Sequence, residues 1–486
     1  MGATAVTAAG DVKLDLGELQ GLLTSAFPRS PAARYLLVEL PDPARARAWL
    51  STVIGRVTFA DTVDEQIRGL RGADRPNLNV AFTAAGLTAL GLTRDRMTDF
   101  SREFREGMVT PHRQRVLGDL PDTPGDPQRW RWGGPQNPAV HGVLLAFGST
   151  ETELDGLCGE VLDPATGVRV VHAMTTLGLA GTREHFGFRD AIASPWVAGL
   201  HRPRAAPDRL PAGEMVLGHV DLTGRPEPYP PIGRDGSYLV IRQLAQDVAG
   251  FWSGLRAAVG DGQAVRWAAK MTGRWPDGTP LAREPVRPIA DPTDDFGYRD
   301  DPDGIRCPLG AHIRRTNPRD GLGAKPADSV ALVNRHRIFR RGRTFGTPAP
   351  PETWPAGIDP VLAEGGADRG ADGGGDGGAA DGPTDSGERG VLFLGLGASL
   401  ARQFEFVQQS WINNPKFGGL YDENDPITGS AHPRLTGSAT GFAFTAPGPV
   451  LNDRVELPTK YVTCLGGGYF FLPGRRALQE LSGRSG

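Results

Sequence analysis

The chain has 486 residues, of which 39% are hydrophobic and 22% are charged, and its formal net charge is −3. Such a chain can bury a core and an internal cavity, but it carries no basic excess that would favour a nucleic-acid partner. No apolar run reaches the roughly 18 residues that a membrane span needs. The first residues lack an export signal and the three cysteines lie far apart, so we expect a cytoplasmic protein without a disulfide framework.

Residues 16–195 alternate predicted strands and helices, after a start at residues 1–15 that we expect to be disordered. The predicted elements are a strand at 33–40, a helix that begins at Pro43 with Asp42 as its N-cap, a strand at 78–92 that passes into a short helix, and a strand at 140–149 followed by a second helix. This β-α-β-β-α-β order is typical of a ferredoxin-like unit.

Residues 196–486 form the second predicted half of the chain. Its first part is rich in Pro, Gly, Asp and Arg, and we expect long loops there with one helix at 237–259. The Gly, Ala and Asp of residues 363–388 have almost nothing to bury, which predicts a flexible surface insertion; their spacing does not fit an EF-hand calcium loop. Further along, the sequence predicts a strand at 389–397, a helix at 399–413, a strand within 440–448, and a strand, turn and helix at 462–481.

His312 lies in an unusually basic stretch, "RCPLGAHIRRTNPRD" at 306–320. No second histidine lies three to five residues away and no Cys-x-x-Cys is present, so the four ligands of a structural zinc site are not in view. A single histidine suits haem, because the macrocycle supplies the other nitrogens. Arg314, Arg315 and Arg319 would then neutralise the haem propionates. A surface loop that binds nothing is the alternative.

Two other stretches combine charge with turn-forming or apolar residues. Asp190 follows Gly-Phe-Arg in "REHFGFRDAIASPW", where it could be a turn residue, an arginine partner or a general acid/base. Residues 334–346, "NRHRIFRRGRTFG", hold five arginines. They form either a basic surface strand or a source of cations for a buried anionic pocket.

Taken together, these stretches resemble the dye-decolorizing peroxidase family, and in particular its longer bacterial-type members. The resemblance is carried by "EHFGFRDAIASP", "RCPLGAHIRRTNPRD", "HRIFRRG", "ASLARQFEFVQQSWINNPKF" and "YVTCLGGGYFFLPG", and it runs from about residue 18 to residue 480. It implies an α+β fold in which two ferredoxin-like halves with antiparallel sheets, 16–195 and 196–486, enclose a haem pocket in the manner of a dimeric α+β barrel. The second half would bind the haem.

The resemblance also implies a role for single residues. His312 matches the proximal haem ligand, Asp190 the distal aspartate and Arg340 the distal arginine. The other residues implied to surround the cofactor are Arg314 and Arg319 as propionate partners, Asn317 at the haem edge, and Glu405 as the acid against the second nitrogen of the proximal imidazole.

The chain departs from the family pattern at two positions. Ala191 stands where the motif ends in glycine, and Gly342 stands where relatives often carry Asn or Ser. Both departures put the efficiency of the peroxidase in question, and Ala191 could reshape the pocket.

The implied activity is a haem b-dependent peroxidase that reduces hydrogen peroxide and oxidises dye-like or phenolic compounds through a ferryl intermediate. Three alternatives stay open: an oxidative biosynthetic enzyme with one specific substrate, a non-enzymatic haem-binding protein, and a binding module for an anionic metabolite. Hydrogen peroxide and an organic reductant are the expected partners, without nucleic acid or membrane, and a homo-oligomer is compatible with the sequence.

Overall fold

The computed structural model describes residues 14–67, 75–177, 182–201, 209–323, 325–350, 353–355, 358, 387–430, 441–448 and 452–484. The predicted disordered start at 1–15 and the predicted insertion at 363–388 lie outside the described residues, except for residues 14–15 and 387–388. Among the described helices, none is long and apolar enough to cross a membrane.

The described strands form a nine-stranded sheet whose pairs are all antiparallel. Its strands are β1 (Ala32–Glu39), β2 (Asn77–Phe82), β3 (Gly142–Gly148), β4 (Arg169–Leu177), β7 (Ser237–Gln246), β8 (Phe339–Arg340), β9 (Arg343–Phe345), β10 (Gly390–Gly397) and β13 (Val462–Leu472). The order across the sheet is β4-β1-β3-β2-β13-β7-β10-β8, and β9 pairs with β10. Smaller sheets join β11 (Phe442–Pro447) to β12 (Asn452–Leu457), and β5 (Trp196–Val197) to β6 (Arg209–Leu210).

The strand order repeats within the sheet. The first four strands of the chain lie side by side in the order β4-β1-β3-β2, which is fourth, first, third, second. The strands β7, β8, β10 and β13 lie in the order β13-β7-β10-β8, which is again fourth, first, third, second. This is the order of a ferredoxin-like unit, so the expected α+β architecture of two such units is confirmed. The units meet where β2 pairs with β13, with Phe82 opposite Phe471. The division of the chain at residue 195 stays a prediction.

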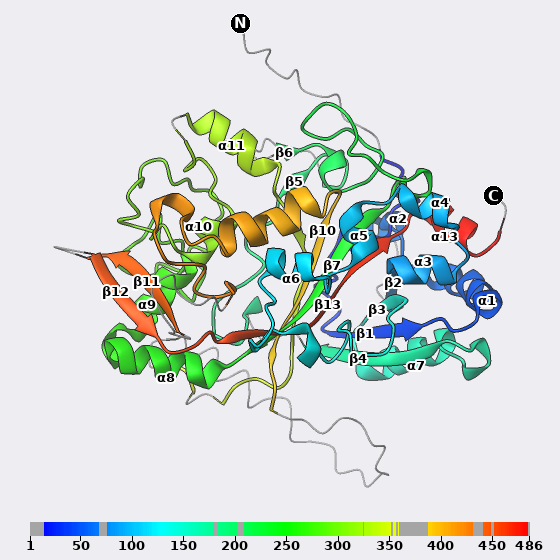
Figure 1. Ribbon diagram of the computed structural model, residues 1–486, viewed down its shortest axis with the longest axis horizontal. Coiled ribbons are helices and arrows are strands. Elements are labelled where there is room, and N and C mark those ends of the chain that lie inside the picture. Colours follow the sequence, from blue (N-terminus) through cyan, green and yellow to red (C-terminus); the bar gives the residue numbers. More distant parts are fainter. Residues whose placement is uncertain are drawn as a thin grey trace, which may run out of the picture.

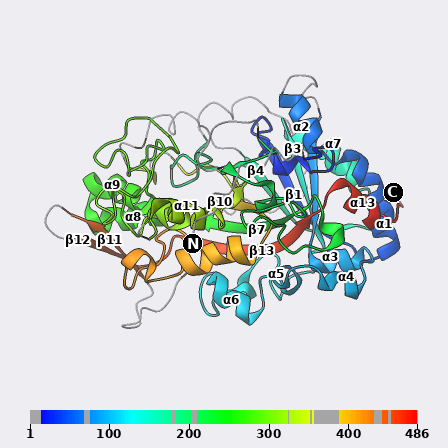
Figure 2. The ribbon, with the colours of Figure 1, turned by 90° about the horizontal axis from the view of Figure 1, so that it is seen from above.

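Helices cover the sheet and extend it at both ends. They are α1 (Pro43–Val53), α2 (Ala60–Ile67), α3 (Ala84–Ala89), α4 (Arg94–Thr98), α5 (Arg102–Glu106), α6 (Pro111–Leu117), α7 (Glu151–Val161), α8 (Val248–Val259), α9 (Asp261–Thr272), α10 (His312–Thr316), α11 (Pro326–Asn334) and α13 (Arg475–Leu481). Figure 1 shows β7, β10 and β13 running through the centre, with α1 and α7 at one end and α8, α9 and the β11–β12 hairpin at the other. Figure 2 places α5 and α6 along one side of β13.

Two of the predicted helices take a different form in the structure. The stretch 237–259 is not one helix: its first ten residues form β7, and the helix α8 begins only at Val248. A central strand buried on both faces has no polar alternation, so its apolar run is easily taken for a helix. The predicted helix at 399–413 is present but winds as two π-helical segments, η9 (Ala401–Glu405) and η10 (Val407–Ile412). Such segments are frequent at functional sites.

The helix predicted to begin at Pro43 is confirmed as α1. The Asp42 carboxylate accepts hydrogen bonds from the backbone N–H groups of Ala44, at 2.8 Å, and Arg45, at 3.0 Å. It thereby satisfies donors that have no partner inside the helix. The helix buries Trp49 and Leu50 in the core.

Both faces of the sheet are buried in apolar cores. Alternate residues of one strand point to opposite faces, so Leu36 belongs to one cluster and Leu37 to the other. A third cluster packs α8 and α9 against the β11–β12 hairpin. The sheet is therefore packed on both faces, and it holds the side chains of the second unit in fixed positions.

We expect Phe471→Ala to weaken the junction between the two units. The Phe471 side chain is fully buried and its ring meets that of Phe100 edge-on at 5.3 Å. Removing such a side chain costs about 3–5 kcal/mol. Urea-induced unfolding should show this loss of stability, whereas Phe471→Leu should lose only about 1–2 kcal/mol. Equal stability of wild type and Phe471→Ala would show that this contact does not hold the units together.

Candidate active site

A cavity of about 390 Å³ lies against the sheet of the second unit. Its walls come from β7, β10, β13, α10, the π-helical segments and the loop that follows β4. Most of the lining is apolar, including Leu244, Ile313, Ile338, Val391, Phe393, Phe404, Val407 and Ile412. The polar side chains that reach it include His312, Asn317, Arg319, Asp190 and Arg340. An apolar pocket with a few convergent polar groups is the usual form of a cofactor site.

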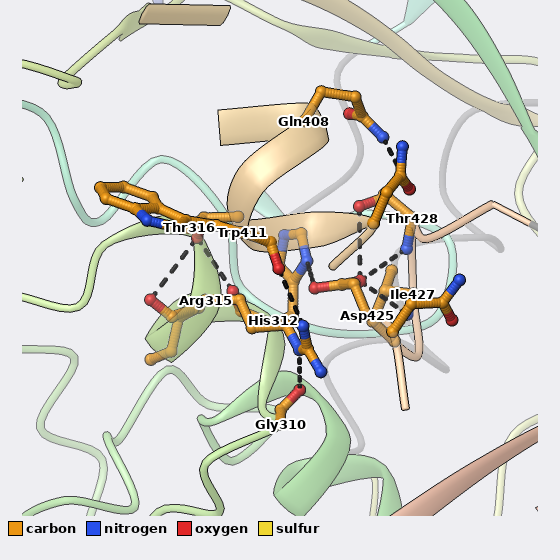
Figure 3. Close-up of polar contacts among 12 residues, drawn as sticks. Gly310, His312, Arg315, Thr316, Gln408, Trp411, Asp425, Ile427 and Thr428 are labelled. Atoms are coloured by element: carbon orange, nitrogen blue, oxygen red, sulfur yellow. Dashed lines mark hydrogen bonds and ion pairs between the residues drawn. The ribbon is translucent and has the colours of Figure 1, made fainter. Parts of the chain in front are cut away.

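His312 begins the short helix α10, and its imidazole lines the cavity. Its Nδ1 lies 2.9 Å from Oδ2 of Asp425. Figure 3 marks this contact with a dashed line. The other carboxylate oxygen of Asp425 accepts the backbone N–H groups of Ile427, at 2.9 Å, and Thr428, at 2.7 Å. Asp425 is therefore held on both of its oxygens.

The charge of Asp425 decides which nitrogen of His312 carries the proton. Burial alone would raise the pKa of this carboxyl, but the adjacent His312 and the backbone N–H of Thr428 lower it to about 2. An ionised carboxylate can only accept, so Nδ1 of His312 donates. The lone pair of the neutral ring then lies on Nε2, which is free to bind a metal.

Glu405 is not the partner of His312, contrary to the prediction from the sequence. It accepts from Nη1 of Arg113, at 2.5 Å, and from the hydroxyl of Tyr469, at 2.8 Å. These contacts tie the π-helical segment to α6 and β13, and burial raises the pKa of Glu405. The acid that faces the imidazole is Asp425.

The arginines that follow His312 have different environments, and two of them do not reach the cavity. Arg314, predicted to meet a propionate, donates instead to Asp301 and to the carbonyl of Cys307. The helical turn of α10 points it away from the cavity. Arg315 donates to the carbonyls of Gly310 and Trp411, and thereby fixes α10 against η10 (Figure 3).

Arg319 does line the cavity, together with Arg274. Both guanidinium groups contact the carboxylate of Asp294, at 3.2 Å for Arg274. Two cations share one anion there, which leaves a net positive charge for an anionic group in the cavity. Asn317 is also part of the lining, and its buried Oδ1 has no hydrogen-bond partner among the described residues.

Asp190 and Arg340 form a second polar pair in the cavity. Nη1 of Arg340 lies 3.5 Å from Oδ1 of Asp190, and its Nη2 donates to the carbonyl of Ala193 at 3.0 Å. Both side chains stay partly exposed, at 44% for Arg340 and 47% for Asp190. The next residue, Arg341, points the other way and donates to the carbonyl of Leu22. Arg340 is the last residue of β8 and Arg341 follows it, so their side chains leave the chain on opposite sides and only the first arginine of the pair lines the cavity.

Glu184 holds the turn that carries Asp190. Its carboxylate accepts from the backbone N–H groups of Phe186 and Phe188, both at 2.9 Å, and from the side chain of Gln246 at 2.6 Å. Burial is the main reason that the pKa of Glu184 rises to about 7. The same turn is closed by the backbone N–H of Asp190, which donates to Thr182.

The cavity suits a haem. A single histidine with its Nδ1 occupied offers one nitrogen to a metal, and apolar side chains line the walls. The positive charge of Arg274 and Arg319 matches the propionates. Among the described residues no three His, Cys, Asp or Glu side chains gather around a metal position, so the remaining ligands would come from a macrocycle.

Sequence reasoning missed Asp425 and Glu184. Asp425 lies in "YDENDP", where three acidic residues follow one another closely and no pattern distinguishes the one that folds back onto His312. Glu184 is adjacent to the Asp190 motif, but a lone glutamate before a turn gives no sign that it will be buried and its pKa raised.

No protein-family model matches the chain. A dye-decolorizing peroxidase of Mycena epipterygia is 30% identical over 454 residues, which cover 83% of this chain and 76% of that protein. The chain belongs to the dye-decolorizing peroxidase family. The multifunctional dye peroxidase DyP2 of Amycolatopsis sp. is 28% identical over 501 residues, 98% of this chain and 97% of that protein.

Solved structures of this family agree with the fold. An ancestral D-type dye-decolorizing peroxidase aligns with a TM-score of 0.77 and 26% identity, over 97% of this chain and 100% of that one. A dye-decolorizing peroxidase in complex with 2,6-dimethoxyphenol aligns with a TM-score of 0.74 and 25% identity, over 96% and 100%. The protein is therefore an oxidoreductase that acts on peroxide, from a family that depends on haem.

Ala191 has a strained backbone. Its φ is +58°, in the left-handed region that glycine occupies without cost. The glycine that the family motif places here would relax this turn, so the peroxidase retains strain beside Asp190.

We expect Ala191→Gly to stabilise the protein by about 0.5–1 kcal/mol, because relief of the strained φ outweighs the added freedom of the unfolded chain. Ala193→Gly is the matched control: its φ is not positive, so it should destabilise by a similar amount. The free energies of urea-induced unfolding test both changes. A loss of stability in Ala191→Gly would contradict the strain assigned to this position.

The pH dependence of stability tests the environment of Glu184. The pKa in the folded state, about 7, lies above the ordinary value of 4.5. As the pH rises, the unfolded chain therefore loses this proton before the folded protein does. The stability that the neutral carboxyl contributes is fully present below about pH 4.5, and it is lost progressively as the pH rises to about 7.

Over this pH range the free energy of unfolding falls by at most about 3 kcal/mol. We expect Glu184→Gln to remove this part of the pH dependence, measured as the free energy of unfolding from pH 4 to pH 8. Parallel curves for wild type and Glu184→Gln would show that Glu184 does not retain its proton.

Proposed function

We propose that this protein is a haem b peroxidase that reduces hydrogen peroxide at the His312 cavity and oxidises phenolic or dye-like compounds. The observation that carries the proposal is the bond between Nδ1 of His312 and the buried Asp425, in the same cavity as the Asp190–Arg340 pair. Support for a phenolic reductant comes from the structural neighbour in complex with 2,6-dimethoxyphenol.

His312 would hold the iron through Nε2. The chemistry that a bound haem supplies is the transfer of two electrons to peroxide. Asp425 accepts the Nδ1 proton of His312, which makes the imidazole a stronger donor and fixes the orientation of its ring. Arg319 and Arg274 would hold the propionates, and Asn317 would lie at the edge of the macrocycle.

Asp190 would move the proton that peroxide cleavage requires. Its carboxylate takes the proton from one oxygen of hydrogen peroxide and returns it to the other, which leaves as water. Arg340 stabilises the negative charge that develops on the departing oxygen. The carbonyl of Ala193 and the carboxylate of Asp190 keep the guanidinium of Arg340 in the cavity without neutralising it completely, since the distance to Asp190 is 3.5 Å.

We also propose a cytoplasmic location. Its support is that Cys158, Cys307 and Cys464 are all free, as is usual in a reducing compartment. Fractionation of the producing cells tests it.

We expect Asp190→Asn to slow the reaction with peroxide by roughly 10²–10⁴-fold, because an amide cannot accept and return the proton. Arg340→Leu should slow it by roughly 10²–10³-fold, and Arg340→Lys, which keeps the charge, by less. Stopped-flow absorbance of the haem-loaded proteins at limiting peroxide measures these rates.

Both sets of variants should keep the Soret band, since neither residue is assigned to hold the haem. His312→Ala should instead lose it. Wild-type rates in both Asp190→Asn and Arg340→Leu would remove their assigned roles, and a Soret band that survives in His312→Ala would remove the role of His312.

A further inference from the structure

His336 is a second histidine of the cavity that the proposed mechanism does not use. It lies between α11 and β8, lines the cavity, and is only 8% exposed. Its ring stacks on Phe406 with a centroid distance of 3.8 Å and an interplanar angle of 8°, and it meets the ring of Trp411 edge-on at 5.2 Å. These contacts fix the plane of the imidazole. Trp411 is the same residue whose carbonyl accepts from Arg315 beneath His312.

The tautomer of His336 is determined by its contact with the backbone. Nδ1 lies 2.5 Å from the carbonyl oxygen of Arg402. A carbonyl oxygen can only accept, so Nδ1 carries the hydrogen and the lone pair of the neutral ring lies on Nε2. Within the described part of the chain no group is hydrogen bonded to Nε2. His336 therefore presents an unused acceptor in a cavity that the apolar side chains of Ile338 and Val407 also line.

The surroundings of His336 favour the neutral ring. Burial is the main reason that the pKa of His336 is lowered; the hydrogen bond to the backbone of Arg402 raises it, and the cations Arg402 and Arg335 lower it further. Arg402 is itself paired with Glu214 and Glu227. Arg337 and Arg340 are further charged side chains of the cavity lining. A neutral Nε2 acceptor repels a carboxylate, so it fits a hydroxyl donor and not a haem propionate.

We propose that His336 is the hydrogen-bond acceptor for a hydroxylated aromatic reductant, and that its Nε2 takes the phenolic proton as the electron leaves. The inference rests on the proposed peroxidase function. It adds a catalytic residue for the oxidation of the reductant, the step that follows the reaction with peroxide. In each step the O–H bond of the phenol breaks: the proton goes to Nε2, and the electron goes to the cofactor that hydrogen peroxide has oxidised. The phenol becomes a phenoxyl radical, and the imidazolium releases its proton to water. Two such steps provide the two electrons and two protons that turn one hydrogen peroxide into two waters.

The test compares a donor that must lose a proton with one that has none to lose. The haem-loaded wild type, His336→Phe and His336→Gln are supplied with peroxide and with either 2,6-dimethoxyphenol or ferrocyanide. His336→Phe keeps the aromatic stack, and His336→Gln keeps a polar side chain should the first fold poorly. His112→Gln, at an exposed position of α6, is the matched control and should behave as wild type.

We expect both His336 variants to lower kcat/KM for the phenol by roughly 10²–10⁴-fold, since a general base is lost. The rate of ferrocyanide oxidation in the same variants should stay at the wild-type value, because ferrocyanide has no proton to lose. The wild-type value for the phenol should decline at pH values below the pKa of the imidazole, which lies under 6.5, and this acid limb should vanish in the variants. A solvent deuterium isotope effect on phenol oxidation should vanish with it.

Binding without turnover gives an independent readout. The dissociation constant of 2,6-dimethoxyphenol, titrated into the haem-loaded protein without peroxide, should rise roughly 2- to 13-fold in the His336 variants, the loss expected for one neutral hydrogen bond.

Three results would overturn the role of His336: unchanged phenol oxidation, an equal loss for both donors, or a lost Soret band that would assign His336 to the haem itself. A wild type that oxidises neither donor would instead refute the proposed peroxidase function, so the two failures are distinguishable.

Discussion

The bond between His312 and Asp425 is the interaction on which the cavity depends. A carboxylate without exposure to solvent is costly unless its oxygens are satisfied, and Asp425 meets this condition with one imidazole N–H and two backbone N–H groups. The arrangement leaves the unprotonated nitrogen of His312 as the only strong donor atom of the ring that can serve a metal. Arg315 stabilises the position of His312, because its guanidinium donates a hydrogen bond from α10 to the carbonyl of Trp411.

The repeated strand order explains how distant parts of the chain reach one cavity. Adjacent strands β8, β10, β7 and β13 present alternate side chains to the same face, so Arg340, Phe393 and Leu244 line it although they lie far apart in the sequence. The π-helical segment supplies the facing side chains Phe404 and Val407, and it also supplies the surface on which His336 stacks. The first unit adds the loop after β4, where Glu184 and the strained Ala191 hold Asp190. Strain and buried charge thus concentrate around the polar groups of the cavity, as is usual where function requires them.

Much of the fold could be predicted from local sequence signals, such as the Asp42 cap and the apolar strand at 389–397. The stretch that begins at Ser237 could not, because a strand buried on both faces carries the same apolar run as a helix. In the site, the basic surroundings of His312 suggested a haem ligand but left a surface loop open, and the roles expected of His312 and Arg340 came from the family resemblance. Both side chains do line the cavity. Arg314 and Glu405 were misassigned because their direction depends on the turn of a helix and on partners such as Asp301, Arg113 and Tyr469. Asp425 could not be found, since its approach to His312 is a contact between residues 113 positions apart.

A crystal structure of the haem-loaded protein tests the central claim most directly. We expect the iron to be bonded to Nε2 of His312, with Nδ1 still within hydrogen-bond distance of Asp425 and with no protein atom on the other side of the iron. Iron bonded to any other side chain, or a His312 ring that has turned away from Asp425, would contradict this account of the site.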